Sequence, residues 1–265
     1  MSDGPRSGAG LRIEVRESVA TLTLDRPDSL NALTVPLKVA LLEAFLAIAA
    51  EPAIRAVILT GAGRAFCAGQ DLAERAEPDA APLENELRER YNPLVRAIRV
   101  LPQPVIAAIN GVAAGAGASL ALACDLRVAS IDARLVLAFA RLGLIPDSGL
   151  TWLLPRLVGP ARAAELALIG DPLSAEAAQA IGLIGRVVPA AELMPAANEI
   201  ADRLAAMAPA ALSLTKRLLA DTWSMDLDAG LEAEAEAQGL AGRTADHAEG
   251  LAAFREKRPP RFSGE

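Results

Sequence analysis

The sequence predicts an α/β core followed by a helical C-terminal region. Short apolar segments such as 56–60 and 104–110 alternate with helical patterns in the first half of the chain. From Gly149 onward the pattern is almost entirely helical, with prolines at several predicted boundaries. The 265 residues suffice for one large domain with a substantial core. We expect residues 1–200 to form the α/β core and residues 201–265 to form the helical region.

The individual elements follow from local patterns. Residues 11–17 and 19–25 carry short apolar and β-branched runs, typical of two strands. Thr34 is a suitable N-cap, and Pro36 stands in the first turn of the helix that follows. Glycines punctuate residues 61–70, which predicts a loop. The other predicted strands are 56–60, 104–110 and 126–130, and the predicted helices are 34–50, 83–101, 115–123, 150–158, 161–169, 175–181, 192–207, 209–222, 227–241 and 245–255.

The composition excludes several function classes. Lys plus Arg is 26 and Asp plus Glu is 33, so the net charge of −7 argues against a nucleic-acid partner. One histidine and two cysteines cannot supply a zinc site with several His or Cys ligands, so we expect no metal. A Ser-His-Asp or Cys-His triad would need His247, which stands in a charged C-terminal stretch. Proton chemistry in this chain is therefore expected to use a carboxylate.

No membrane or export segment is expected. Residues 104–124 carry no charge, but Asn110 and Gly111 interrupt them, so they predict a buried strand, a turn and a buried helix. Residues 1–10 lack the apolar core of a signal peptide. Two cysteines without a disulfide framework favour a reducing, cytoplasmic setting.

The glycine-rich segment 110–117 follows a predicted strand and opens a helix, which superficially matches a dinucleotide fingerprint. Three strands precede it, no ribose-binding acid follows at the expected distance, and the only tyrosine, Tyr91, lies upstream. A dehydrogenase is therefore the weaker interpretation. The glycines either pack a helix closely on a strand or present backbone N–H groups, reinforced by the helix dipole, to an oxyanion.

Two further segments carry candidate chemistry. In 66–72 (FCAGQDL), Cys67 is best explained as a small buried hydrophobe, and Gly69 permits a turn that exposes the N–H of Gln70. Asp147 precedes a helix and is either a turn or N-cap residue or a general acid/base whose pKa rises in the apolar flank of Leu144, Ile145 and Pro146, near Trp152. Spacing alone does not separate these alternatives.

Together these segments resemble the crotonase (enoyl-CoA hydratase/isomerase) superfamily over residues 11–262. Within it, segments 91–95, 142–147 and 151–156 are most similar to isomerases that act on ring-1,2-epoxyphenylacetyl-CoA. The superfamily resemblance rests on the segments 24–27 (LDRP), 31–33 (NAL), 59–63 (LTGAG), 66–72 (FCAGQDL), 104–117 (PVIAAINGVAAGAG) and 254–262 (FREKRPPRF).

The resemblance implies a spiral of ββα units, with the helical C-terminal region making contacts in a homotrimer or a dimer of trimers. It implies an acyl-CoA thioester substrate and no separate cofactor, because coenzyme A is part of the substrate. The thioester oxygen would accept hydrogen bonds from the backbone N–H groups of Gln70 and Ala116. The other implied CoA-ester contacts are Arg26, Ser29, Leu30, Ala68, Asp71, Leu72, Gly115 and Lys257, of which Lys257 would reach a CoA phosphate across a subunit boundary.

The resemblance also bears on the reaction. Hydratases of the superfamily use two glutamates, and the corresponding positions here hold Ser119 and Phe139. Asp147 stands where several isomerases carry their acid/base, and a single base suits isomerisation. We therefore expect an acyl-CoA isomerase that converts ring-1,2-epoxyphenylacetyl-CoA to oxepin-CoA, 3-enoyl-CoA to 2-enoyl-CoA, or both. The alternatives are a hydratase-family enzyme of other specificity and a non-catalytic CoA-ester-binding homologue.

Overall fold

The computed structural model describes residues 6–265, so half of the segment 1–10 considered for export lies outside the described residues. In the described part, seven strands form one sheet in the order β1-β2-β3-β4-β6-β8-β11 and four form a second in the order β10-β9-β7-β5. The strands are β1 (Arg6–Gly8), β2 (Leu11–Arg16), β3 (Val19–Leu24), β4 (Ala56–Gly61), β5 (Ala65–Cys67), β6 (Val105–Ile109), β7 (Val112–Ala114), β8 (Leu126–Ser130), β9 (Arg134–Val136), β10 (Leu173–Ser174) and β11 (Arg186–Val188).

The helices connect and cover these sheets. The α-helices are α1 (Val35–Ala49), α2 (Leu72–Arg75), α3 (Leu83–Glu86), α4 (Asn92–Val100), α5 (Ala116–Ala123), α6 (Leu150–Val158), α7 (Pro160–Ile169), α8 (Ala175–Ala180), α9 (Leu193–Ala205), α10 (Pro209–Asp221), α11 (Leu227–Ala241) and α12 (Ala245–Glu256). The shorter helical turns are η1 (Pro27–Ser29), the π-helical η2 (Leu87–Tyr91), η3 (Ala140–Leu142), η4 (Ala190–Glu192) and η5 (Thr222–Ser224).

A strand–strand–helix unit repeats through the core. Strands β4, β6 and β8 pair in parallel in the first sheet, and the next strands, β5, β7 and β9, pair in parallel in the second. After each pair the chain enters a helix, of which α5 and α6 are the clearest examples. The predicted spiral of ββα units is confirmed.

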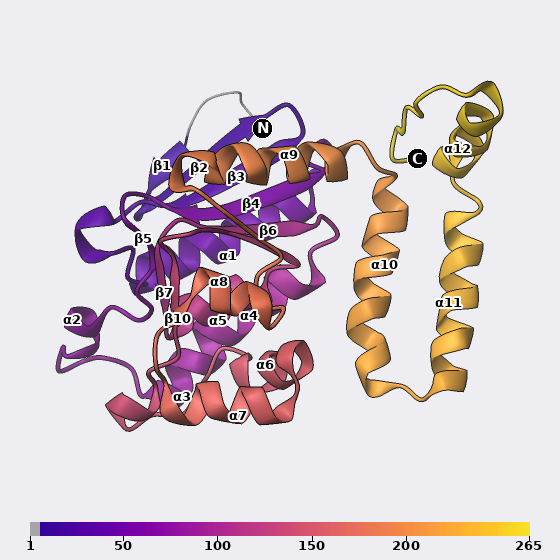
Figure 1. Cartoon of the computed structure of the whole chain (residues 1–265). Helices are drawn as coiled ribbons and strands as arrows, with labels where there is room; N and C mark the ends of the chain where they lie inside the picture. The colour runs from indigo at the N-terminus through magenta and orange to yellow at the C-terminus, as the bar shows by residue number, and fades with distance from the viewer. Residues whose placement is uncertain (1–5) are drawn as a thin grey trace.

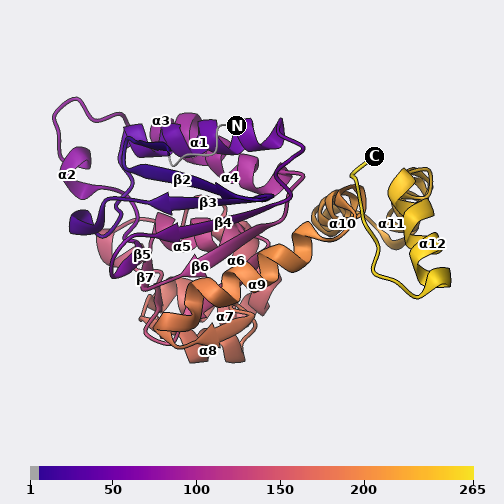
Figure 2. The ribbon, with the colours of Figure 1, turned by 90° about the horizontal axis from the view of Figure 1, so that it is seen from above.

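Successive side chains of a strand point to opposite faces of the large sheet, so each central strand contributes to the packing on both faces. Val57 and Leu59 of β4 belong to the main core beneath α1, whereas Ala56 and Ile58 pack against α9. Figure 2 shows α1 and α9 on opposite faces of the sheet. Both faces are covered, so β6 is apolar along its whole length and β4 is apolar up to Thr60, as expected for parallel strands.

The C-terminal helices α10, α11 and α12 form an arm at one end of the core (Figure 1). Helix α10 contacts the core through Lys216, which pairs with Asp125 at 2.6 Å, and α11 and α12 lie farther out. Helix α9 spans residue 200 and still packs on the sheet, so the arm begins with α10 at Pro209. The arm exposes large apolar side chains, including Phe254 at 84%. Its role in a trimer stays a prediction.

The structure departs from the predicted elements in two ways. Six short strands of two or three residues, β1, β5, β7, β9, β10 and β11, were not predicted, because so few residues show no period-two pattern. The helix predicted over 83–101 is divided by the π-helical turn η2, which ends at Tyr91. Residues 104–124 form β6, β7 and α5, and within residues 6–265 no helix is long and apolar enough to cross a bilayer.

Candidate active site

Two backbone N–H groups meet at one cavity. Leu33 forms a parallel bridge with Gln70 through the flanking residues: its N–H donates to the Gly69 oxygen at 2.7 Å, and its oxygen accepts from the Asp71 N–H at 3.1 Å. In such a bridge the N–H of the middle residue points away from the partner strand, so the Gln70 N–H faces away from Leu33. Ala116 is the first residue of α5, where an N–H has no partner within the helix. Gln70 and Ala116 both line the cavity.

Close backbone packing explains the glycines around these donors. Gly69 has a φ of +91°, and a Cβ there would lie 2.7 Å from the Ala114 oxygen and 3.3 Å from the Ala116 nitrogen. A Cβ on Gly117 would lie 2.3 Å from the Cys67 oxygen. The loop after β5 therefore lies directly against the start of α5, which brings the two N–H donors together.

Asp147 lies in the same cavity and is half-buried. Burial raises the pKa of its carboxyl, and a hydrogen bond of 2.8 Å from the Ser148 hydroxyl opposes that rise. The N-cap of α6 is Gly149 and no side chain caps that helix, so Asp147 is not an N-cap. It is a turn residue, as the other alternative expected, because its main-chain oxygen accepts from the Leu150 N–H at 2.9 Å. The raised pKa suits a group that takes up and releases a proton.

The apolar surroundings of Asp147 differ in part from those expected. Ile145 is 76% exposed, and neither it nor Trp152 lines the cavity. Trp152 packs instead against Trp223, with ring centroids 4.8 Å apart. The walls are Leu72, Leu83, Leu87, Tyr91, Phe139, Leu142 and Leu144, around a cavity of about 180 Å³.

The structure places Ser119 and Phe139, the two positions expected to correspond to the hydratase glutamates, at or beside the cavity. Ser119 is fully buried in α5, and its hydroxyl lies 3.1 Å from the main-chain oxygen of Asp147 and 3.3 Å from that of Gly115. Phe139 is buried and forms part of the cavity wall. Neither side chain can act as a carboxylate base.

The cavity contains a polar cluster that the sequence analysis missed. Tyr91 and Glu86 line it, and Lys38 reaches them from α1. A signal was present: Lys38 lies in the apolar stripe of α1, three and seven residues before Leu41 and Phe45. A lysine in that stripe must be buried and therefore needs a partner.

The predicted CoA-ester residues fall into three groups. Ala68, Leu72 and Gly115 line the cavity beside Gln70, Ala116 and Asp147. The second group lies next to the cavity, partly around η1, between β3 and α1, and partly at the start of α2. This group comprises Arg26, Ser29, Leu30 and Asp71.

Hydrogen bonds hold this second group together. Arg26 donates to Asp71 at 2.8 Å, and the Leu30 oxygen accepts from the Ala68 N–H at 2.9 Å. The Asp71 carboxylate also caps α2, and the Arg26 guanidinium holds the pKa of that carboxyl below its ordinary value. This local scaffold fixes the loop that carries Gln70.

The structure does not bring the third group, Lys257, to the cavity of its own chain. Lys257 follows α12 at the end of the arm, whereas α2 lies at the opposite end of the molecule (Figure 1). A contact between Lys257 and a bound CoA would therefore need a neighbouring subunit.

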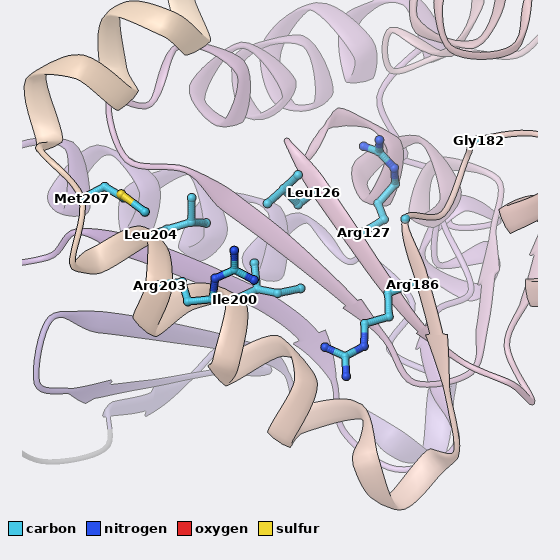
Figure 3. Close-up of a pocket in the computed structure, with 9 residues that line it drawn as sticks. Leu126, Arg127, Gly182, Arg186, Ile200, Arg203, Leu204 and Met207 are labelled. Carbon is cyan, nitrogen blue, oxygen red and sulfur yellow. The ribbon is translucent and has the colours of Figure 1, made fainter.

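A second cavity of about 420 Å³ lies between α9 and strands β8 and β11 (Figure 3). Three arginines line it, but Arg127 donates to the oxygens of Cys124 and Leu183, and Arg186 pairs with Glu199. None of the predicted site residues lines this cavity. Within residues 6–265 no cluster of His, Cys, Asp and Glu side chains is placed to hold a metal ion.

Comparison with known proteins agrees with this geometry. A sequence model of the enoyl-CoA hydratase/isomerase family matches residues 14–265. The chain is 47% identical over 253 residues to the 1,2-epoxyphenylacetyl-CoA isomerase of Escherichia coli (strain K12), covering 94% of this chain and 97% of that protein. It is 46% identical over 254 residues to a probable enoyl-CoA hydratase of Rhodobacter capsulatus, covering 96% and 98%. A crystal structure of a putative enoyl-CoA hydratase from Streptomyces coelicolor A3(2) superimposes with a TM-score of 0.92 at 42% identity, over 100% of this chain and 98% of that one.

Proposed function

The chain belongs to the enoyl-CoA hydratase/isomerase family, and we propose that it is an acyl-CoA isomerase acting on ring-1,2-epoxyphenylacetyl-CoA, on 3-enoyl-CoA esters, or on both. One observation carries the proposal: of the two carboxylates that line the cavity, only Asp147 is outside an ion pair in the part of the chain described. Glu86 is held by Lys38 and Arg90. A single available carboxylate favours proton transfer within one substrate over the addition of water.

For a 3-enoyl-CoA substrate, two backbone N–H groups would bind the thioester oxygen and Asp147 would transfer the proton. The N–H groups of Gln70 and Ala116 donate to the thioester oxygen as it becomes enolate-like. Asp147 removes a proton from C2 and returns one to C4, which moves the double bond to the 2-position. One such donor contributes roughly 3–4 kcal/mol to the stability of an oxyanionic transition state.

For the epoxide substrate the same groups support rearrangement of the fused ring to the seven-membered oxepin. The product has the same atoms as the substrate, so no water or bound cofactor is consumed. The apolar and aromatic wall that includes Tyr91 and Phe139 suits a cyclic acyl group. The similarity to the E. coli isomerase supports this substrate.

The test compares turnover of three substrates by the wild-type protein and by Asp147→Asn. The substrates are ring-1,2-epoxyphenylacetyl-CoA, a 3-enoyl-CoA and a 2-enoyl-CoA, the last assayed for hydration. We expect isomerisation by the wild type, little hydration, and loss of isomerase turnover in Asp147→Asn with CoA-ester binding retained. Asp171→Asn, which changes an exposed carboxylate, is the matched control.

Two outcomes would contradict the proposal. Efficient hydration of the 2-enoyl-CoA without isomerisation would assign the chain to the hydratases, as the name of the R. capsulatus relative suggests for that protein. Tight binding of all three esters with no turnover would instead indicate a non-catalytic CoA-ester-binding protein.

The proposal extends to the assembly. We propose a homotrimer or a dimer of trimers in which the arm of α10 to α12 packs on a neighbouring subunit and Lys257 approaches that subunit's CoA phosphates. Light scattering after size-exclusion chromatography gives the subunit number, and a monomer would contradict this part.

A further inference from the structure

A buried polar cluster lies beneath the proposed oxyanion donor at Gln70. The side-chain oxygen of Gln70 accepts from the Tyr91 hydroxyl at 2.6 Å and from the Lys38 ammonium at 3.0 Å. Lys38 also pairs with Glu86, and Glu86 pairs with Arg90. These residues come from α1, from the continuous run of α3 and η2, and from the loop after β5, so the cluster joins three separate segments.

The buried polar groups of the cluster find their hydrogen-bond partners in one another or in the main chain. The Lys38 side chain is 0% exposed, and its ammonium faces the Glu86 carboxylate, the Gln70 oxygen and the Tyr91 ring, whose centroid lies 4.8 Å away. An ammonium only donates, so the oxygen of the Gln70 amide must face it. The amide nitrogen of Gln70 lies 3.4 Å from the main-chain oxygen of Asp71 and donates to it. The side chain of Gln70 is therefore engaged by the protein and not by substrate.

The Gln70 N–H belongs to the planar Gly69–Gln70 peptide unit, so its direction is fixed when both the oxygen of that unit and the Gln70 Cα atom are held in place. Gly69 precedes Gln70 at a φ of +91°, and glycine has the least restricted backbone of any residue. The bridge to Leu33 holds the Gly69 oxygen and the Asp71 N–H on one side of this unit. At the Gln70 Cα atom, the described contacts are those that the Gln70 side chain makes with Lys38, Tyr91 and the main chain of Asp71.

We propose that Lys38 and Tyr91 are positioning residues for the oxyanion site: by clamping the Gln70 side chain they hold the Cα end of the peptide unit whose N–H donates, while the Leu33 N–H holds the oxygen of that unit. Glu86 pairs with Lys38 and favours its charged form, and Arg90 in turn holds the Glu86 carboxylate in place. The inference rests on the proposed function only in assigning the Gln70 N–H to the thioester oxygen.

The experiment uses Lys38→Met and Gln70→Met, which remove the clamp, and Gln70→Glu, which keeps an acceptor for Lys38. Lys216→Met is the matched control, because Lys216 is also buried in an ion pair, with Asp125 at 2.6 Å, and lies outside the cavity. Three quantities are measured: kcat and KM for isomerisation, the thermal midpoint, and the near-ultraviolet enolate absorbance of bound acetoacetyl-CoA. The enolate signal reports stabilisation of the oxyanion without requiring turnover.

We expect Lys38→Met and Gln70→Met each to lower kcat about tenfold, with KM changed less than about twofold, because losing an oxyanion donor outright costs about 10²–10³ in kcat. Both variants should lower the bound enolate fraction, and the double variant should be no worse than the poorer single variant. Gln70→Glu should recover most of both signals. Lys216→Met should lower the thermal midpoint and leave kcat and the enolate signal unchanged.

The inference is overturned if Lys38→Met and Gln70→Met keep the wild-type enolate fraction, or if Gln70→Glu behaves like Gln70→Met. Its failure can be told apart from that of the proposed function. A wild-type protein that stabilises the bound enolate but isomerises nothing would refute isomerase activity, and the enolate readout of the variants would still decide the role of Lys38.

Discussion

The hydroxyl of Ser119 lies 3.1 Å from the main-chain oxygen of Asp147. Ser119 stands in α5, three residues after Ala116, so one buried side chain connects the helix of an oxyanion donor to the loop of the proposed acid/base. This hydrogen bond ends on the main chain of Asp147, so Ser119 contacts the loop that carries the proposed acid/base and not its carboxylate.

Ser119→Ala tests this connection. A hydrogen bond of this kind contributes about 1 kcal/mol, so we expect kcat for isomerisation to fall about fivefold. Ser130→Ala, at another fully buried serine outside the cavity, is the control and should leave kcat unchanged. Equal kcat for Ser119→Ala and the wild type would show that the Asp147 loop does not depend on this contact.

The pH dependence of turnover should reflect the buried carboxyl of Asp147. As the base it must be ionised, so kcat/KM should fall as the pH decreases through the raised pKa of Asp147. The Ser148 hydroxyl opposes that rise, so Ser148→Ala should move the acidic limb to higher pH. The measurement is a pH profile of kcat/KM for both proteins, and a shift to lower pH would contradict the assignment.

Asp147 should also lower stability at neutral pH. A carboxyl whose pKa is raised in the folded state favours folding when protonated, and this contribution is lost as the pH rises through the folded pKa. Asp147→Asn should therefore raise the free energy of unfolding at pH 7, by about 1.4 kcal/mol for each unit of pKa shift. Denaturant unfolding at pH 7 and near pH 4 checks this, because the difference should shrink at the lower pH.

Gly69→Ala should disrupt the oxyanion site. The new Cβ would lie 2.7 Å from the Ala114 oxygen, on a residue with a positive φ. We expect an activity loss of at least about 10²-fold, since the loop must move away from Ala116. Gly239→Ala in α11, where a Cβ meets only ordinary contacts, should instead gain about 0.5–1 kcal/mol of stability and keep activity. Steady-state kinetics and thermal unfolding of both variants distinguish the two effects.

The cysteines should be unreactive in the folded protein. Burial raises the pKa of Cys67 and of Cys124 to about 12, so almost no thiolate exists at pH 8. We expect neither to be alkylated by iodoacetamide under native conditions and both to be alkylated in denaturant, as measured by mass spectrometry. Rapid native labelling of Cys67 would contradict the role of a small buried hydrophobe.

Much of the core could be predicted from sequence because its strands and helices are long enough to show a period. The strands β4, β6 and β8, the cap of α1 by Thr34 and the burial of residues 104–124 follow from such patterns. The second sheet escaped prediction because its strands are two or three residues long and are fixed by pairing with strands distant in the sequence.

Part of the site could also be predicted, because local sequence patterns mark three of its residues. Gln70, Ala116 and Asp147 stand beside glycine or proline turns that mark them locally, and the structure brings them to one cavity. The cluster of Lys38, Glu86 and Tyr91 could not be found from spacing, because Lys38 lies in α1, far along the chain from Glu86 and Tyr91, and their contact exists only after folding.

The second sheet has a consequence for how the proposed donors are spaced. Gln70 follows the end of β5 and Ala116 follows the end of β7, and these strands are parallel neighbours. Neighbouring strands lie about 4.8 Å apart, which is close to the separation of two N–H groups that share one oxygen at roughly 2.9 Å each. The separation of the two proposed N–H donors is therefore set by the backbone pairing of β5 with β7. Side-chain substitutions along β5 and β7 should leave that width unchanged, whereas inserting one residue in either turn would alter it.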